Sequence, residues 1–65
     1  MCEFTVLLDD GKEKKQIAKG VVKAKVKDGK IVLMDTSGGV TKVEDAVITV
    51  VDTMMAEMVL RSGKE

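Results

Sequence analysis

Hydrophobic residues alternate with polar ones along most of the chain, and this period of two constrains the fold more than any other feature. The clearest stretch is residues 22–26, where Val22, Ala24 and Val26 alternate with lysines. Successive side chains of an extended strand point to opposite faces, whereas a helix repeats its apolar positions about every three to four residues. The pattern therefore predicts an all-β protein.

Asp28-Gly29 separates this stretch from a second apolar run, Ile31–Met34. Asp-Gly between two alternating runs is among the strongest sequence signals for a β-hairpin with a two-residue loop. Such a loop fixes the register, and one face of the hairpin is then wholly apolar. The predicted pairs are Val26 with Ile31, Ala24 with Leu33, Lys25 with Val32, and Lys23 with Met34.

Further strands are expected at residues 4–8, 13–19, 40–43, 46–51 and 56–60, with 13–19 as a short edge strand. Residues 46–51 are apolar on both faces, which predicts a central strand or one at a subunit contact. Residues 52–55 are expected to form a tight reversal. The alternative for residues 54–61 is a helix, because Met, Ala, Glu and Leu favour helix.

Six to seven short strands joined by tight turns predict a small single-domain barrel or a strongly curved antiparallel sheet. We expect one β domain over residues 1–61 and a polar tail over 62–65. The chain has 65 residues and one cysteine, so its core is small and an intrachain disulfide is impossible. Self-association, as a homodimer, is the expected source of additional stability.

Composition argues against catalysis and against membrane insertion. The chain has no histidine, which is the usual general base and a frequent metal ligand. It has no glycine-rich phosphate loop, and the side chains of its adjacent carboxylates, Asp9-Asp10 and Glu44-Asp45, diverge on extended backbone, so we do not expect an enzyme. The longest apolar run is four residues, whereas a membrane-spanning helix needs about 20. A cytoplasmic location is expected, where a single thiol stays reduced.

Cys2 is the strongest chemical feature of the sequence. If Met1 is removed, as happens when the second residue is small, Cys2 carries a free α-amine beside its own thiol. These two donors close a five-membered chelate ring, and a metal displaces both protons near neutral pH. Glu3 could add its amide nitrogen or a carboxylate oxygen. Nitrogen and thiolate donors suit Ni(II) or Cu(II), and a two-fold dimer would double the donor set. The alternative is that Cys2 is an incidental small hydrophobic residue.

Three lysines, Lys23, Lys25 and Lys27, lie on one face of a predicted strand with Lys30 nearby. Their spacing of about 6.6–6.8 Å makes a basic ridge that could follow an RNA backbone. A solvated strand face that prevents aggregation is the favoured interpretation. The chain has 11 basic and 11 acidic residues and a single aromatic residue, which is atypical of nucleic-acid-binding domains.

Methionines form a third group. Thioethers bind Cu(I), but they more often fill cores and contacts. We therefore expect packing, and for Met54 and Met55, which fall in a predicted turn, a place at an interface. The four residues concerned are Met34, Met54, Met55 and Met58.

Several segments together resemble the CooT-like family: the start Met1–Val6, the hairpin Val26–Leu33, the turn at Gly38 and the run Val50–Asp52. Members are small nickel-binding proteins associated with the maturation of nickel enzymes, notably carbon monoxide dehydrogenase. Archaeal relatives are also labelled predicted RNA-binding proteins. The resemblance implies a homodimer of small β-barrels with nickel bound near Cys2, and a client nickel enzyme as partner.

Overall fold

The computed structural model describes residues 3–62, which form six β-strands and no helix. This confirms the all-β class and the expected number of strands. Residues 54–61 form part of a turn and most of the last strand, so the helical alternative is wrong. Ser62, placed at the start of the predicted tail, belongs to that strand. The strands are β1 (Phe4–Asp9), β2 (Lys14–Lys27), β3 (Lys30–Asp35), β4 (Val40–Glu44), β5 (Ala46–Asp52) and β6 (Glu57–Ser62).

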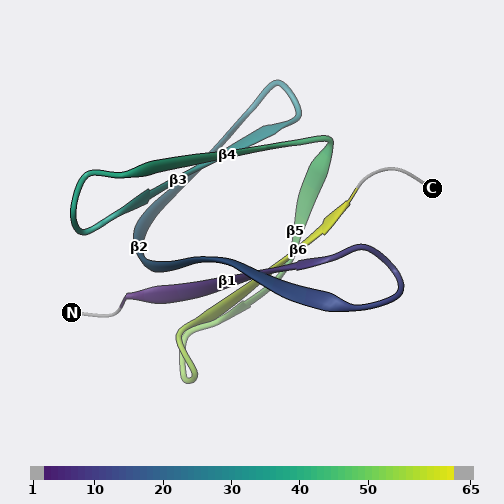
Figure 1. Ribbon diagram of the computed structural model, residues 1–65, viewed down its shortest axis with the longest axis horizontal. Helices are drawn as coiled ribbons and strands as arrows, with labels where there is room; N and C mark the ends of the chain where they lie inside the picture. Colours follow the sequence, from purple (N-terminus) through teal and green to yellow (C-terminus); the bar gives the residue numbers. More distant parts are fainter. Residues whose placement is uncertain (1–2, 63–65) are drawn as a thin grey trace.

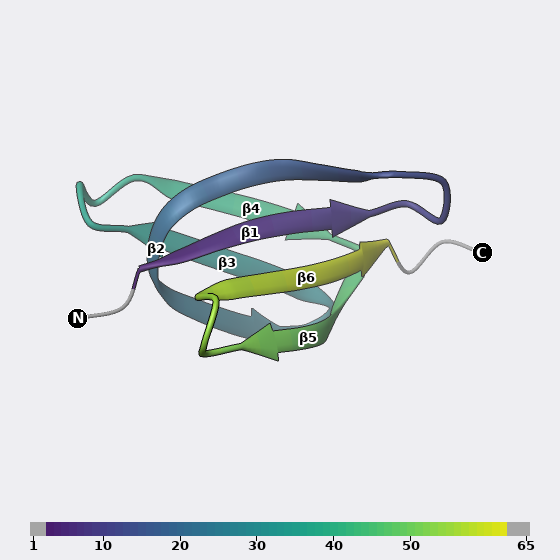
Figure 2. The same cartoon turned by 90° about the horizontal axis from the view of Figure 1, so that it is seen from below.

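The six strands form one curved sheet in the order β4-β3-β2-β1-β6-β5 (Figure 1). β1 and β6 are parallel and the other neighbours are antiparallel. The expectation of a purely antiparallel sheet is therefore wrong at this one pair. The sheet is not closed into a barrel, because β4 and β5 do not pair. Only Asp45, at φ 56°, separates them in the chain, so the sheet curls until its two edges meet at this corner (Figure 2).

β2 is a single strand of 14 residues that serves two neighbours. Residues 14–21 pair with β1 and residues 21–27 pair with β3. Gly20 lies at the change of partner, at φ 66°, where a side chain would be strained. The prediction of a separate edge strand at 13–19 is therefore wrong, because this glycine bends the strand without ending it.

The Asp28-Gly29 hairpin has the predicted register, including Val26 with Ile31 and Lys25 with Val32. Asp28 and Gly29 have φ values of 53° and 75°. Two positive φ values in a two-residue loop define the turn whose twist matches that of the flanking strands. The local sequence therefore fixes this part of the sheet without help from distant contacts.

The core lies on the concave side of the curled sheet. Each fully buried aliphatic side chain contributes roughly 1.5–3 kcal/mol relative to its exposed state. These residues come from four strands, so the core holds together segments that are far apart in sequence. The five largest fully buried side chains are Val6, Val21, Ile31, Leu33 and Leu60.

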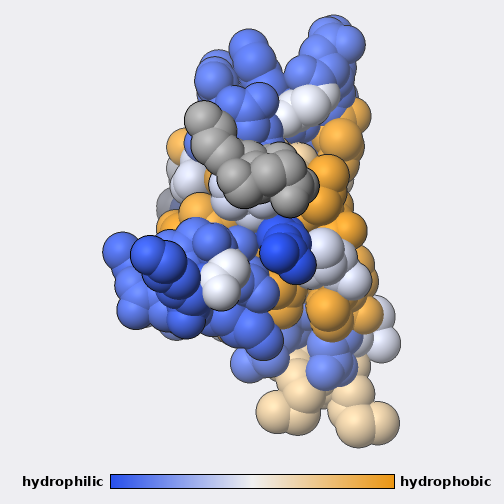
Figure 3. Space-filling view, turned by 90° about the vertical axis from the view of Figure 1, so that its right-hand side faces the viewer, coloured by the Kyte–Doolittle hydropathy of each residue, from blue (hydrophilic) through white to orange (hydrophobic). Residues whose placement is uncertain are grey.

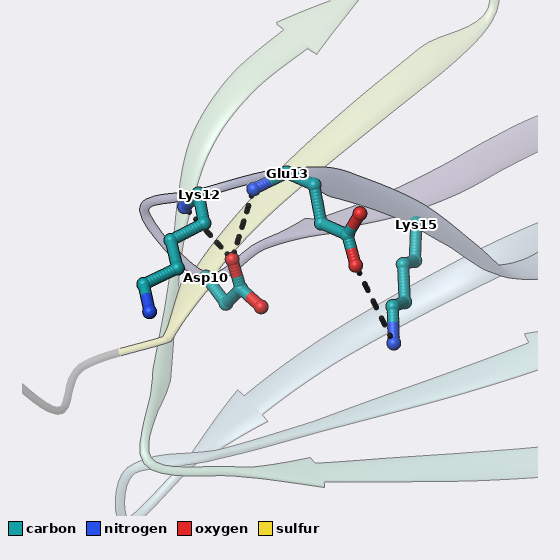
Figure 4. A network of polar contacts seen from close by, with 4 residues as sticks. All are labelled: Asp10, Lys12, Glu13 and Lys15. Carbon is teal, nitrogen blue, oxygen red and sulfur yellow. Dashed lines mark hydrogen bonds and ion pairs between the residues drawn. The ribbon is translucent and has the colours of Figure 1, made fainter.

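Residues 10–13 join β1 and β2 in a turn that is held by Asp10 (Figure 4). Asp10 Oδ1 accepts hydrogen bonds from the backbone N–H groups of Lys12 at 2.8 Å and Glu13 at 3.0 Å. The bond from Glu13, followed by that from Lys12, lowers the pKa of Asp10 below its usual value. Lys15 Nζ lies 3.7 Å from Glu13 Oε2 in an exposed ion pair.

Candidate functional site

The amino end of β1 lies over the bend in β2. Cys2 lies outside the described residues, and Glu3, which follows it, is exposed. A methyl group added at Gly20 would lie 3.7 Å from Glu3 Oε1 and 3.8 Å from Thr36 Oγ1. The Thr36 N–H donates to the Gly20 carbonyl at 3.0 Å. The Glu3 carboxylate therefore sits beside a small set of polar atoms from β2 and the β3–β4 turn.

The β5–β6 turn lies next to this amino end. The Thr5 N–H donates to the Ala56 carbonyl at 2.9 Å, where the parallel pairing of β1 and β6 begins. Asp52 Oδ1 accepts from the N–H groups of Met54 at 3.0 Å and Met55 at 2.9 Å, which holds the turn. The predicted reversal at 52–55 is thus confirmed. The sequence placed these methionines in a turn but gave no sign that they neighbour the amino end.

Exposed apolar side chains line β5 and continue into this turn, and we call this set the apolar edge. β5 lies at one side of the sheet, so its prediction as a central strand is wrong, whereas its prediction as a subunit contact stays a prediction. Figure 3 shows hydrophobic residues along one border of the molecule and the β5–β6 turn projecting at the bottom. The apolar edge comprises Val47, Val50, Val51, Met54 and Met55, with Met54 91% exposed.

Metal-ligating residues were predicted at Cys2 and Glu3. Within residues 3–62, no three His, Cys, Asp or Glu side chains lie close enough together to hold a metal ion. Glu3 can offer a carboxylate oxygen, because its side chain is exposed at the end of the chain where Cys2 is attached. The metal site at Cys2 and Glu3 stays a prediction, because Cys2 lies outside the described residues.

The predicted lysine ridge lies on the outer, convex face of β2, β3 and β4. The register places outward residues of β2, β3 and β4 opposite one another in three rows across the sheet. The rows are Lys27, Lys30 and Glu44; Lys25, Val32 and Lys42; and Lys23, Met34 and Val40. Residues directly opposite one another share a face. The sequence did not place Lys42 in the ridge. Lys42 lies there because β3 pairs with β4, and no local motif predicts that pairing. We call the five lysines of these rows, with Val32 and Met34, the lysine face.

A shallow hollow of about 250 Å³ opens on the lysine face. Its lining is formed by Lys23, Lys25, Lys27, Val32 and Met34. Val32 and Met34 are half-buried and form an apolar floor, while the lysine stems form one wall with their charges above it. This arrangement can hold an apolar group whose neighbours are anionic.

The β3–β4 turn closes one end of the lysine face and is held by Asp35. Asp35 Oδ1 accepts from Ser37 Oγ at 2.6 Å, from the Gly39 N–H at 2.8 Å and from the Ser37 N–H at 2.9 Å. The hydrogen bond from the Ser37 hydroxyl, followed by that from Gly39, lowers the pKa of Asp35 below its usual value. The ionised carboxylate thus stabilises this end of the face.

An apolar edge and a cationic face thus lie on one small sheet. The model of a family described as CO dehydrogenase accessory protein CooT matches residues 1–61. The chain therefore belongs to the CooT family of accessory proteins, as its motifs had indicated. No curated protein matches the chain. No helix within residues 3–62 is long and apolar enough to cross a membrane.

Proposed function

We propose that this protein is a nickel-binding, metallochaperone-like accessory protein that holds Ni(II) at Cys2 of a homodimer and serves a nickel enzyme. Membership of the CooT family supports this most directly, because its match begins at residue 1 and includes Cys2 and Glu3. The family description names CO dehydrogenase, which is therefore the client enzyme we propose. No catalytic role is proposed for the chain itself.

The donor chemistry of the amino terminus fits this proposal. After removal of Met1, the Cys2 thiolate and α-amine would supply two donors, and Glu3 would supply an amide nitrogen or a carboxylate oxygen. Amine and thiol groups ordinarily titrate at about pH 7.7–8.0 and about pH 8.5, so a bound metal displaces both protons near neutral pH. The bound nickel is cargo here: the ligands hold it and a client accepts it.

A second copy of the chain would complete the donor set. The turn that bears Met54 and Met55 lies beside the amino end of β1 through the Thr5–Ala56 hydrogen bond. A two-fold contact through this turn and Val51 would bring the two amino ends to the same interface, because an isologous contact repeats every neighbour on both sides of the axis. Exposed apolar groups favour such a contact, since association removes them from water.

Nickel titration of three proteins tests the proposal. We expect wild type to bind Ni(II), Cys2→Ser to lose binding by at least about 100-fold for the loss of a thiolate ligand, and Glu3→Gln to lose less. Glu13→Gln is the matched control, because it removes one exposed carboxylate at the far end of the sheet. Circular dichroism verifies folding, and mass spectrometry establishes whether Met1 is removed. Equal nickel uptake by wild type and Cys2→Ser would end the proposal.

RNA binding is the second candidate function. The observation in its favour is that Lys23, Lys25, Lys27 and Lys30 lie on one face. The chain as a whole carries 11 basic and 11 acidic residues and so offers a polyanion no long-range attraction. Filter retention of RNA that weakens steeply with salt would support it.

A further inference from the structure

We infer that the lysine face is a docking surface for an extended acidic protein segment in which carboxylates and apolar side chains alternate along the side that faces the sheet. The inference concerns a partner of the accessory protein and is independent of nickel, because the lysine face lies on β2, β3 and β4 and includes no residue of the proposed metal site.

Charge is the first observation that points to an anionic partner. The three rows of the face carry five lysines, Lys23, Lys25, Lys27, Lys30 and Lys42, and one carboxylate, Glu44. Five minus one leaves four positive charges on a chain whose overall formal charge is zero. Lys30 Nζ and Glu44 Oε2 lie 4.0 Å apart, so the other four lysines form the available cationic surface.

Spacing is the second observation. Lys23, Lys25 and Lys27 follow one another at every second residue of β2, which separates them by about 6.6–6.8 Å along the strand. An extended peptide repeats its same-side residues at the same interval. The side chains on the near side of such a segment are therefore spaced as the three lysines are.

The hollow supplies the third observation. Its volume of about 250 Å³ is suited to one or two aliphatic side chains, and its floor is Val32 and Met34. The cross-strand partners of Val32 are Lys25 and Lys42. An apolar side chain that enters the hollow would lie beside the lysines that line it, and these lysines can pair with carboxylates two residues before and after it on the same side of the segment.

The same features favour a protein segment over RNA. Single-stranded nucleic acid gains much of its affinity by stacking bases on aromatic side chains. The only aromatic residue of the chain, Phe4, packs against the core. Glu44 on the face would oppose a continuous phosphate backbone. The local pattern of four uncompensated lysines and an apolar floor therefore matches a short acidic segment better than a polyanion.

Fluorescence anisotropy with labelled peptides tests the inference. The first probe, the Glu-Leu peptide, has nine residues with Glu, Leu, Glu, Leu and Glu at every second position and Ser between them. The second, the Glu-Ser peptide, has Ser in place of both Leu and the same charge. We expect the Glu-Leu peptide to bind the full chain at low salt and the Glu-Ser peptide to bind about tenfold more weakly, because it cannot fill the hollow. Equal binding of the two peptides would overturn the assignment of the hollow.

Charge-reversal variants locate the binding surface. Lys25→Glu, at the centre of the face, should weaken Glu-Leu binding by at least about tenfold. Lys12→Glu is the matched control, because it makes the same change in the exposed turn at the other side of the sheet, and its binding should equal that of wild type. Equal loss in both variants, or no binding by wild type, would contradict the inference. Tighter binding of a uridine oligonucleotide of equal charge would replace the acidic segment with RNA.

Nickel uptake keeps this test separate from that of the proposed function. Lys25→Glu should retain wild-type nickel binding, and Cys2→Ser should retain wild-type peptide binding. Loss of peptide binding in Cys2→Ser would show that the peptide occupies the amino end and not the lysine face, which would overturn the inference whatever the nickel result.

Discussion

The lysine face and the apolar edge are built from the same sheet by the same alternation of side chains, yet they differ in every property relevant to binding. On β2 the outward positions are lysines, and the opposite edge strand, β4, carries Lys42 and Glu44. On β5, residues 46–51 carry no charge at all. Sheet edges in soluble proteins are usually protected by charge. β4 follows this rule and β5 does not, so the two regions present different chemistry to their surroundings.

The comparison also separates stability from recognition. Both regions enclose one core, so their difference lies in what they present to the outside. A charged face prevents unwanted contacts between molecules. An exposed apolar edge promotes such contacts, so we expect a defined partner to cover it. A second copy of the chain is the partner we propose for the apolar edge.

The largest effects should come from the shared core. Leu33 lies beneath the lysine face on β3 and Leu60 lies beside β5 on β6, and both are almost fully buried. Truncation to Ala should lower the free energy of unfolding by about 2–5 kcal/mol at either site. Urea unfolding followed by circular dichroism measures this. A large loss at one site and a small loss at the other would mean that the two halves do not share a core.

The next largest effect should be on self-association. Val51→Lys and Met55→Lys place a charge on the apolar edge at positions already exposed in the single chain. We expect each to weaken the dimer by at least about tenfold, because a desolvated charge opposes association, with little change in folding. Sedimentation equilibrium measures the dissociation constant. Lys25→Ala on the lysine face is the control, and an equal effect there would break the distinction between the two regions.

A smaller effect should come from the turn that closes the lysine face. Since folding lowers the pKa of Asp35, the ionised carboxylate stabilises the fold above its unfolded pKa of about 3.9, and this contribution is lost as the pH falls through the lower folded value. Asp35→Asn should therefore be less stable than wild type near neutral pH, and the gap should close under acid conditions. Urea midpoints across this range test it. A gap that widens on acidification would contradict the assignment.

The smallest effect should come from the Lys30–Glu44 pair. Both side chains are more than half exposed and their charged atoms lie 4.0 Å apart. Exposed pairs of this kind contribute about 0–1 kcal/mol. Lys30→Ala should therefore leave the free energy of unfolding, measured by urea titration, almost unchanged, within about 0.5 kcal/mol. A clear loss of stability would show that the lysine face also supports the fold.

Local signals in the sequence predicted the parts of the fold that depend on near neighbours. The Asp28-Gly29 hairpin and its register are correct because both turn residues adopt the positive φ that their identity favours. The lysine ridge follows from that register. The site at Cys2 and Glu3 was predicted from donor chemistry and family resemblance, and it stays a prediction that the described residues leave untested.

Long-range pairing could not be predicted in the same way. The parallel contact of β1 with β6 joins residues more than 50 positions apart, such as Thr5 and Glu57, and no local motif encodes it. Gly20 resembled the end of a strand but bends a continuous one. β5 was expected at the centre of the sheet or at a subunit contact because it is apolar on both faces, and it lies at an edge with several valines exposed. This last error is informative, since it marks the surface where a partner is proposed.

Native mass spectrometry of the nickel-loaded protein tests the central claim most directly. The account predicts a dimer whose chains begin at Cys2 and which retains nickel. The Cys2→Ser protein should retain no nickel. Nickel held equally well by single chains, or by Cys2→Ser, would contradict the claim that a terminal cysteine at a two-fold contact binds the metal.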